Sequence, residues 1–128
     1  MTREELIHAY RSYIACLNHQ DWENLYRFVD EDVIYNGERI GLSGYREMLE
    51  ADFKAIPDLA FTISHLASDP PTIAASLHFD CTPRGELFQI PVNGTRVQFI
   101  ENVLYEFNEG RIARVCSVID KEAIRQQL

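Results

Sequence analysis

The last third of the chain, residues 95–128, constrains the fold more than any other stretch. From Val97 to Phe107 every second residue is apolar except Glu101, which is the period of a strand with one buried face. A turn at residues 108–110 and a β-branched run from Ile112 to Ile119 follow. We therefore predict a long β-hairpin that ends at Asp120 and continues as a helical tail. Strands of this length twist and curl around what they cover.

The composition is that of one globular domain, which we place at residues 1–128. The chain has 128 residues, of which 46% are hydrophobic, so it can bury one core. No apolar run approaches the roughly eighteen residues of a membrane span, and the N-terminal MTREELIHAY does not read as a signal peptide. The formal net charge of −8 disfavours nucleic acid and anionic membranes as partners.

The three cysteines, Cys16, Cys81 and Cys116, lie far apart, and no CxxC motif is present. An odd number of widely spaced cysteines is typical of reduced thiols in a core. We therefore expect a cytoplasmic protein without disulfides.

Helical patterns precede most of the strands, and a short strand at residues 33–35 is predicted between the second and third helices. Apolar residues at helical spacing predict a first helix over residues 3–19, a short second helix from Asp21 and a third from Ser43 to Pro57. Alternating patterns over residues 59–66 and 73–82 then predict strands. This order indicates an α+β fold, with three N-terminal helices packed on a strongly curved antiparallel sheet and a pocket between them.

The other face of such a sheet would carry Ser76, His78, Asp80, Ile100 and Leu104. This mixture is too apolar for open solvent, and three short helices can cover only one face. We therefore expect two copies of the chain to pack through this face as a two-fold homodimer.

Several segments together resemble one family. They are AIPDLAF, GEL-x-x-x-PVNG, YEFNEGRI and the closing S-x-x-D-x-x-x-x-x-QQL. In their order and spacing they are similar to the SnoaL-like polyketide and ester cyclases, which belong to the nuclear transport factor 2-like superfamily. The resemblance implies a cone-shaped α+β roll with an internal cavity. It also implies a homodimer and cofactor-free acid/base chemistry on an apolar or aromatic carbonyl compound. The proton acceptor of that family falls on Asp120.

The chain departs from related patterns at several pocket positions. Relatives carry THxGE where this chain has Thr82-Pro83-Arg84-Gly85-Glu86, and a tryptophan where it has Cys116. The two pocket carboxylates of ketosteroid isomerases correspond here to Asn36 and Val103, which disfavours steroid isomerisation.

Two carboxylates are candidate catalytic residues, and each has a structural alternative. Asp120 either faces the cavity or only caps the helical tail. The alternation of side chains along residues 112–119 does not decide between these two positions, because both faces of the strand are apolar and a bulge could exchange them. Glu101 lies on the same face of its strand as the apolar residues on either side of it, so its side chain should point inward. Burial there would raise its pKa. The alternative is a bulge that turns the side chain outward.

Other residues are candidates for the cavity wall. His65 lies on the apolar parity of its strand, either as a rim residue or as a catalytic group. No HxH or HExxH spacing and no glycine-rich phosphate loop is present, so we expect neither a metal nor a cofactor. The predicted substrate-binding residues are Tyr10, Tyr13, Trp22, Asn36, His65, Phe99, Val103, Tyr105 and Cys116.

Two functional classes remain after the sequence analysis. One is a cofactor-independent enzyme that removes a proton next to a carbonyl, giving cyclisation, isomerisation or dehydration. The other is a dimeric binding protein that uses the same cavity without chemistry. A buried carboxylate at the cavity favours the first, and carboxylates in solvent favour the second.

Overall fold

The computed structural model describes residues 1–128. Most strands follow the three predicted helices, but two strands lie between the second and the third, and a short helix ends the chain. In chain order the elements are α1 (Arg3–Asn18), the 3₁₀ helix η1 (Trp22–Arg27), β1 (Val29–Tyr35), β2 (Glu38–Arg39), α2 (Gly41–Ala55), β3 (Thr62–Asp69), β4 (Thr72–Cys81), β5 (Glu86–Leu87), β6 (Ile90–Pro91), β7 (Val97–Asn108), β8 (Arg111–Ile119) and α3 (Lys121–Gln126).

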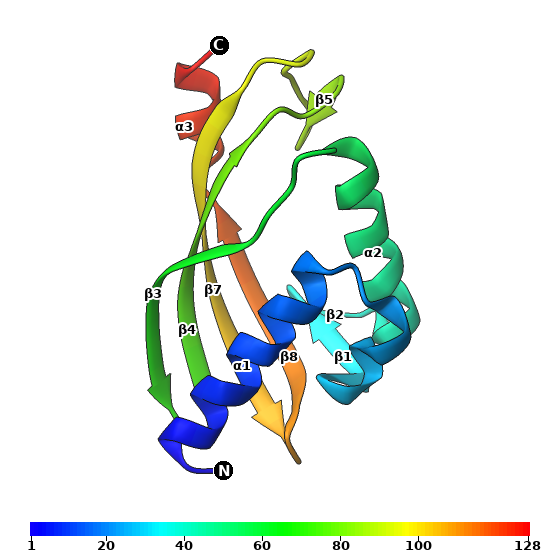
Figure 1. The fold of residues 1–128 in the computed structure, drawn as a ribbon, viewed down its shortest axis with the longest axis vertical. Coiled ribbons are helices and arrows are strands. Elements are labelled where there is room, and N and C mark those ends of the chain that lie inside the picture. Colours follow the sequence, from blue (N-terminus) through cyan, green and yellow to red (C-terminus); the bar gives the residue numbers. More distant parts are fainter.

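Six strands form the main sheet in the order β2-β1-β8-β7-β4-β3 (Figure 1). The β7–β8 hairpin confirms the prediction from the last third of the chain. β7 pairs with β4 on one side and with β8 on the other, both antiparallel. Residues from β4, β7 and β8 therefore make the centre of the sheet.

The sheet differs in two respects from the strongly curved antiparallel sheet that the sequence predicts. It is mixed, because β1 runs parallel to β8, and it is not strongly curled. β4 and β7 pair without interruption from Thr72–Glu106 to Cys81–Val97, and the register shifts that could bend the sheet lie in other strand pairs. Because bulges are what kink a long strand pair, this uninterrupted pair limits curling.

The two long helices, α1 and α2, pack on one side of the sheet. In Figure 1, α1 crosses the lower half of the sheet and α2 lies beside its β1 edge. The contacts agree, because α1 touches β3 and β4 whereas α2 touches β1. The second predicted helix is a 3₁₀ turn, η1, rather than an α-helix. None of the helices combines the length and apolarity that a membrane crossing requires.

A capping box fixes the start of α1, as the Thr2 and Glu5 spacing indicates. The Glu5 backbone N–H donates to the Thr2 hydroxyl at 3.1 Å, and the Thr2 backbone N–H donates to the Glu5 carboxylate at 2.9 Å. One stripe of the helix is then buried against the sheet; it comprises Leu6, Tyr10, Tyr13, Ile14 and Leu17.

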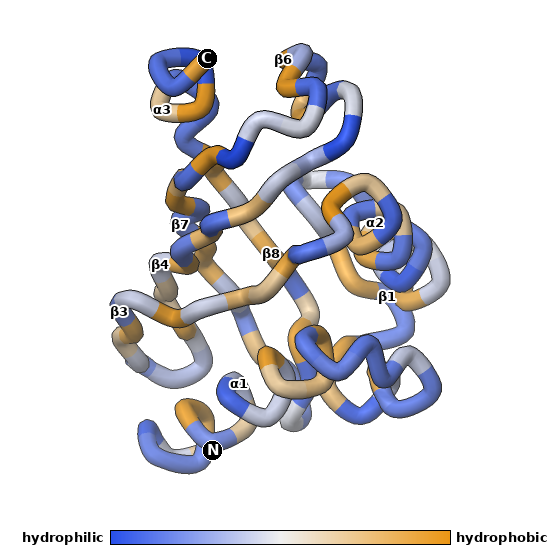
Figure 2. The backbone as a smooth tube through the Cα atoms, turned by 45° about the horizontal axis from the view of Figure 1, so that its top comes forward, coloured by the Kyte–Doolittle hydropathy of each residue, from blue (hydrophilic) through white to orange (hydrophobic).

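Alternation along the strands separates a buried face from an exposed one. Hydrophobic and hydrophilic residues follow one another along the tube in Figure 2, and alternate residues of β4 from Ile73 to Cys81 are buried. The opposite face keeps large apolar side chains in solvent: Ile100 is 40% exposed, Leu104 53% and Val118 70%. Hydrophobic residues this exposed on one sheet face suit an interface.

We propose that this outer face is a homodimer interface, and expect Val118→Glu to convert a dimer into a monomer. A carboxylate there would be desolvated in the interface without a partner. Sedimentation velocity at micromolar concentration measures the change. Tyr26→Glu, which alters an apolar residue 49% exposed on η1, is the matched control and should leave the dimer intact. A wild-type chain that sediments as a monomer contradicts the proposal.

Candidate active site

An apolar cavity of about 170 Å³ lies between α2 and the sheet. Nine of its eleven lining residues are hydrophobic, and the other two are carboxylates. The walls come from β1, α2, β4, β7 and β8, from the connection between α2 and β3, and from the turn of the β5–β6 hairpin. The lining residues are Tyr35, Met48, Asp52, Ile56, Leu59, Phe61, Phe79, Phe88, Phe99, Glu101 and Ile119.

Glu101 points into the cavity from the middle of β7. The β4–β7 register is continuous there, so no bulge turns the side chain outward and the inward prediction holds. Its Oε2 accepts a short hydrogen bond from the Ser117 hydroxyl on β8. The Ser117 backbone N–H in turn donates to Asn36 Oδ1 at 2.7 Å, so a loop residue fixes the strand that holds Glu101.

Asp52 is the second carboxylate of the cavity, and the sequence analysis missed it. It lies on α2 four residues after Met48 and four before Ile56, so the three side chains share one face of the helix. Its carboxylate makes neither a hydrogen bond nor an ion pair within the chain. A carboxylate on an apolar helical stripe was the signal that could have identified it.

Burial changes the proton affinity of both carboxylates. Desolvation, and to a smaller degree the nearby charge of Glu101, raises the pKa of Asp52 to about 6. Desolvation also raises the pKa of Glu101, although the hydrogen bond from Ser117 acts in the opposite direction. Two carboxyl groups in one apolar space therefore hold protons more strongly than surface groups do.

A cluster of tyrosines lies in the core and not in the cavity wall. Tyr10 donates to the Tyr105 hydroxyl at 3.2 Å, and the hydroxyls of Tyr13 and Tyr45 lie 2.6 Å apart. Each buried hydroxyl thus has a partner, as buried polar groups require. The prediction that Tyr10, Tyr13 and Tyr105 line the cavity is therefore not met, because they pack against one another.

Asp120 takes the capping position of the two alternatives. Its Oδ1 accepts a hydrogen bond from the Ala123 backbone N–H at 3.1 Å, at the start of α3. The residue is exposed and is not part of the cavity wall. The expectation that it lines the cavity fails because β8 ends at Ile119 and the chain turns into the helix.

A bulge explains why Cys116 lies outside. The β7–β8 register shifts between Glu106 and Phe107, so Ile112 and Val115, three residues apart, are both buried. Ser117 and Ile119 then face inward, whereas Cys116 is exposed. Cys116 is therefore neither a cavity residue nor a core thiol, in contrast to the buried Cys16 and Cys81.

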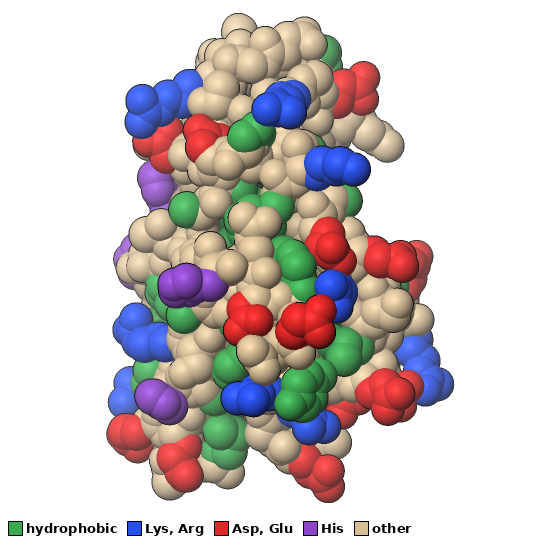
Figure 3. All heavy atoms as spheres, turned by 45° about the vertical axis from the view of Figure 1, so that its right-hand side comes forward, with side chains coloured by type: hydrophobic (Ala, Val, Ile, Leu, Met, Phe, Trp, Pro, Cys, Tyr) green, Lys and Arg blue, Asp and Glu red, His purple; other side chains and the backbone are tan.

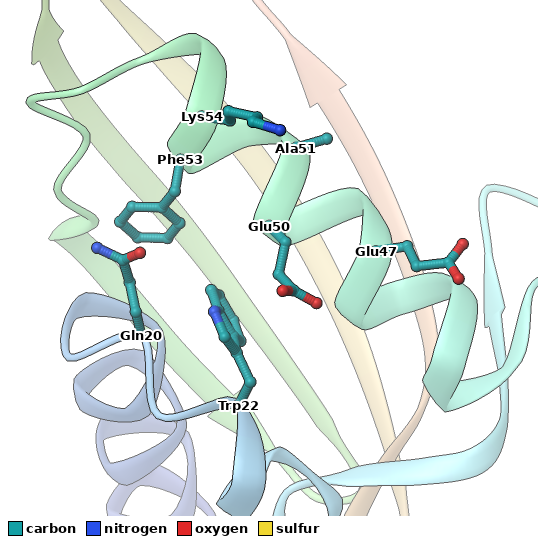
Figure 4. A pocket seen from close by; sticks show the side chains of 7 residues that line it. All are labelled: Gln20, Trp22, Glu47, Glu50, Ala51, Phe53 and Lys54. Atoms are coloured by element: carbon teal, nitrogen blue, oxygen red, sulfur yellow. The ribbon is translucent and has the colours of Figure 1, made fainter.

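The remaining predicted residues have different positions. Phe99 lines the cavity as expected, but Val103 is buried outside it. Asn36 is exposed and acts through Ser117, and His65 is exposed on the outer face of the sheet. Trp22 lines a different hollow of about 580 Å³ beside α2, where its ring lies near Phe53 (Figure 4).

That larger hollow is open and partly lined by charged side chains, including Glu47, Glu50 and Lys54 (Figure 4). Charged side chains of both signs are mixed over the face shown in Figure 3, with hydrophobic ones visible between them. No three His, Cys, Asp or Glu side chains lie together in a way that could hold a metal ion. The apolar cavity with its two carboxylates is therefore the stronger candidate site.

Comparison with known families matches residues 7–128 to SnoaL-like polyketide cyclases. This span includes every residue of the cavity wall. The chain belongs to the SnoaL-like polyketide cyclase family. A comparison with curated protein sequences finds no match for this SnoaL-like chain.

Solved structures agree with the family. A SnoaL-like polyketide cyclase from Agrobacterium tumefaciens is 50% identical, with a TM-score of 0.95 over 99% of this chain and 98% of that one. TsrD from Streptomyces laurentii is 19% identical, with a TM-score of 0.86 over 99% and 96% of the two chains. The second likeness shows the fold alone.

The two-residue turn of the β5–β6 hairpin places another side chain of this SnoaL-like protein at the cavity. Leu87 pairs with Ile90, and Phe88 and Gln89 between them have φ of 51° and 67°. Turns of this kind favour asparagine and glycine, because other residues at positive φ are strained. Phe88 lines the cavity and meets the Phe99 ring edge-on at 6.0 Å.

Replacing Asp52 with asparagine should stabilise the fold at neutral pH. The folded pKa of about 6 lies above the unfolded value of about 3.9, so ionised Asp52 opposes folding above pH 6 and has no effect below about pH 4. We expect Asp52→Asn to raise the free energy of unfolding by about 1–3 kcal/mol at pH 7.5, with no gain at pH 4.

Urea unfolding at the two pH values measures this difference. Glu47→Gln, on an exposed position of the same helix, is the control and should change stability little at either pH. An Asp52→Asn variant no more stable than the wild type at pH 7.5 contradicts the assigned pKa.

Replacing Gln89 with glycine should also stabilise the protein, because glycine adopts positive φ without strain. We expect a gain of about 1 kcal/mol in the free energy of unfolding, measured by urea titration. Glu86→Gly, in β5, is the control and should lose about 0.5–1 kcal/mol, because a strand glycine only costs entropy. Equal losses in both variants mean that the turn is not strained.

Proposed function

We propose that this SnoaL-like protein is a cofactor-independent acid/base enzyme, in which Glu101 removes a proton from the carbon next to a carbonyl group. The observation that supports this is a carboxylate in an apolar cavity with no cationic partner. Burying such a group costs free energy, so folds keep it chiefly where chemistry needs it.

The surroundings of Glu101 suit a general base. Ser117 holds Oε2, while Oε1 makes no hydrogen bond within the chain and is free to accept a proton. The raised pKa of Glu101 brings it nearer to neutral pH, where a base is most effective. Nine apolar side chains line the space around it, which leaves few other polar groups near the proton.

Tyr35 is placed to stabilise the negative charge that forms on the substrate oxygen. It lines the same cavity from β1 and is half-buried. Burial raises the pKa of its hydroxyl, so Tyr35 keeps its proton and can donate a hydrogen bond. A donor at this position would act on the enolate oxygen as an oxyanion hole does.

The step balances without another reactant. The C–H electron pair forms the enolate, and the proton moves to Glu101. The enolate carbon can then attack a second carbonyl, which becomes an alkoxide. An enolate conjugated with a double bond can instead take up a proton at the far end of that double bond, and an enolate with a β-hydroxyl can expel it as water. The protonated Glu101 returns its proton to the new alkoxide, to the carbon or to the leaving hydroxyl. Cyclisation, isomerisation and dehydration thus share the same first step.

The size of the cavity sets the scale of the substrate. A cavity of about 150 Å³ accommodates benzene, and this one measures about 170 Å³. We therefore propose a substrate with a single ring or an aliphatic body of similar size. A non-catalytic binding protein is the alternative, and the desolvated position of Glu101 favours the enzyme.

Glu101→Gln should abolish proton removal. With phenylacetone as the probe in D₂O, NMR follows replacement of the hydrogens next to the carbonyl by deuterium. Loss of a general base should lower the exchange rate by about a hundred- to ten-thousandfold. Thermal unfolding of the variant checks that the fold is retained.

Asp120→Asn tests whether Asp120, the other carboxylate that the sequence suggests, is the general base instead of Glu101. Asparagine caps a helix nearly as well as aspartate, so the fold should be preserved. Exchange that is lost in Asp120→Asn but kept in Glu101→Gln would assign the base to Asp120. Exchange kept in both variants would mean that neither carboxylate is the base, and exchange absent from the wild type would favour the binding protein.

A further inference from the structure

The negative charges in the cavity have no positively charged side chain beside them. Two carboxylates line it, Asp52 from α2 and Glu101 from β7, and no Lys, Arg or His is among the lining residues. Neither carboxylate takes part in a salt bridge, although seven ion pairs form elsewhere on the chain. An unpaired charge in an apolar space is costly, and a bound cation removes that cost.

The walls offer a second attraction for a cation. Five aromatic rings surround the space, from Tyr35, Phe61, Phe79, Phe88 and Phe99. The faces of such rings attract ammonium groups, most strongly where water is excluded. The Phe88 ring already attracts one cation, because Lys121 Nζ lies 5.9 Å from its centre, although Lys121 is not part of the wall.

The remaining walls restrict which cation fits. Aliphatic side chains such as Met48, Ile56 and Ile119 make no hydrogen bonds and suit a hydrocarbon body. A metal ion needs further charged or imidazole ligands, and no third His, Cys, Asp or Glu is grouped with the two carboxylates. An anion would meet two like charges. An organic cation with one charged end satisfies all of these conditions.

We propose that the ligand of this cavity is a small organic ammonium ion, with one ring or an aliphatic body of similar size, whose nitrogen pairs with Asp52. Asp52 is the better partner because its carboxylate has no hydrogen bond, whereas Glu101 is held by Ser117. The ammonium proposal rests on the proposed function only in its choice of site and in taking Glu101 as the base. If both proposals hold, the substrate is an amine that also carries a carbonyl group.

Benzylamine and benzyl alcohol test the proposal as probes of equal size, one charged and one neutral. Isothermal titration calorimetry at pH 7.5 compares their dissociation constants. A hydrogen-bonded ion pair should favour benzylamine by about ten- to a hundredfold. The comparison is repeated in 0.5 M NaCl, which screens attraction to the exposed acidic surface but not to a buried pair.

Asp52→Asn should reduce this preference to less than about threefold, because the ion pair is lost while the cavity keeps its shape. Glu47→Gln removes the same formal charge from an exposed position on the same helix and should keep the preference. Equal binding of the two probes to the wild type overturns the proposal. A preference that survives in Asp52→Asn, or disappears in salt, overturns it as well.

The calorimetry and the deuterium exchange test the two proposals separately, so one proposal can be contradicted while the other stands. Calorimetry needs no turnover, so a preference for benzylamine without exchange leaves the ammonium site and removes the enzyme. Exchange of phenylacetone without a preference for benzylamine leaves the base and removes the ammonium site.

Discussion

The double pairing of β7, with β4 on one side and β8 on the other, holds the rest of the structure in place. Glu101 lies opposite Leu77 on β4 and Ile119 on β8. Side chains opposite one another in register stand on the same face of a sheet, so both apolar neighbours flank the carboxylate. A charged residue is thereby held among apolar side chains by strands that cannot shift without breaking the centre of the sheet.

The polar groups of the interior are treated in two different ways. The core tyrosines satisfy one another, as in the Tyr13–Tyr45 pair, and no side-chain polar atom is both fully buried and without a partner. Asp52 and Glu101 keep free oxygens toward the cavity. Pairing in the core stabilises the fold, whereas unpaired carboxylates oppose it and are typical of sites where stability is given up for function.

Membership of the SnoaL-like family does not define the chemistry by itself, because one fold hosts many activities. The family match and the A. tumefaciens structure establish the scaffold. The dimensions and charges of the cavity carry the functional argument. A space of about 170 Å³ with two carboxylates is the basis on which we propose a smaller and more basic ligand than a multi-ring polyketide.

The sequence by itself determined what depends on neighbours along the chain: the capping box of α1, the β7–β8 hairpin and the α+β order all follow from local periodicity and turns. It left Glu101 and Asp120 open, and it missed Asp52. Tertiary structure decided these, because desolvation depends on residues distant in sequence that meet only when strands and helices pack. The bulge between β7 and β8 likewise exchanged the faces of Cys116 and Ser117. The local sequence pattern determines which helices and strands form, but only their packing determines which carboxylate is desolvated.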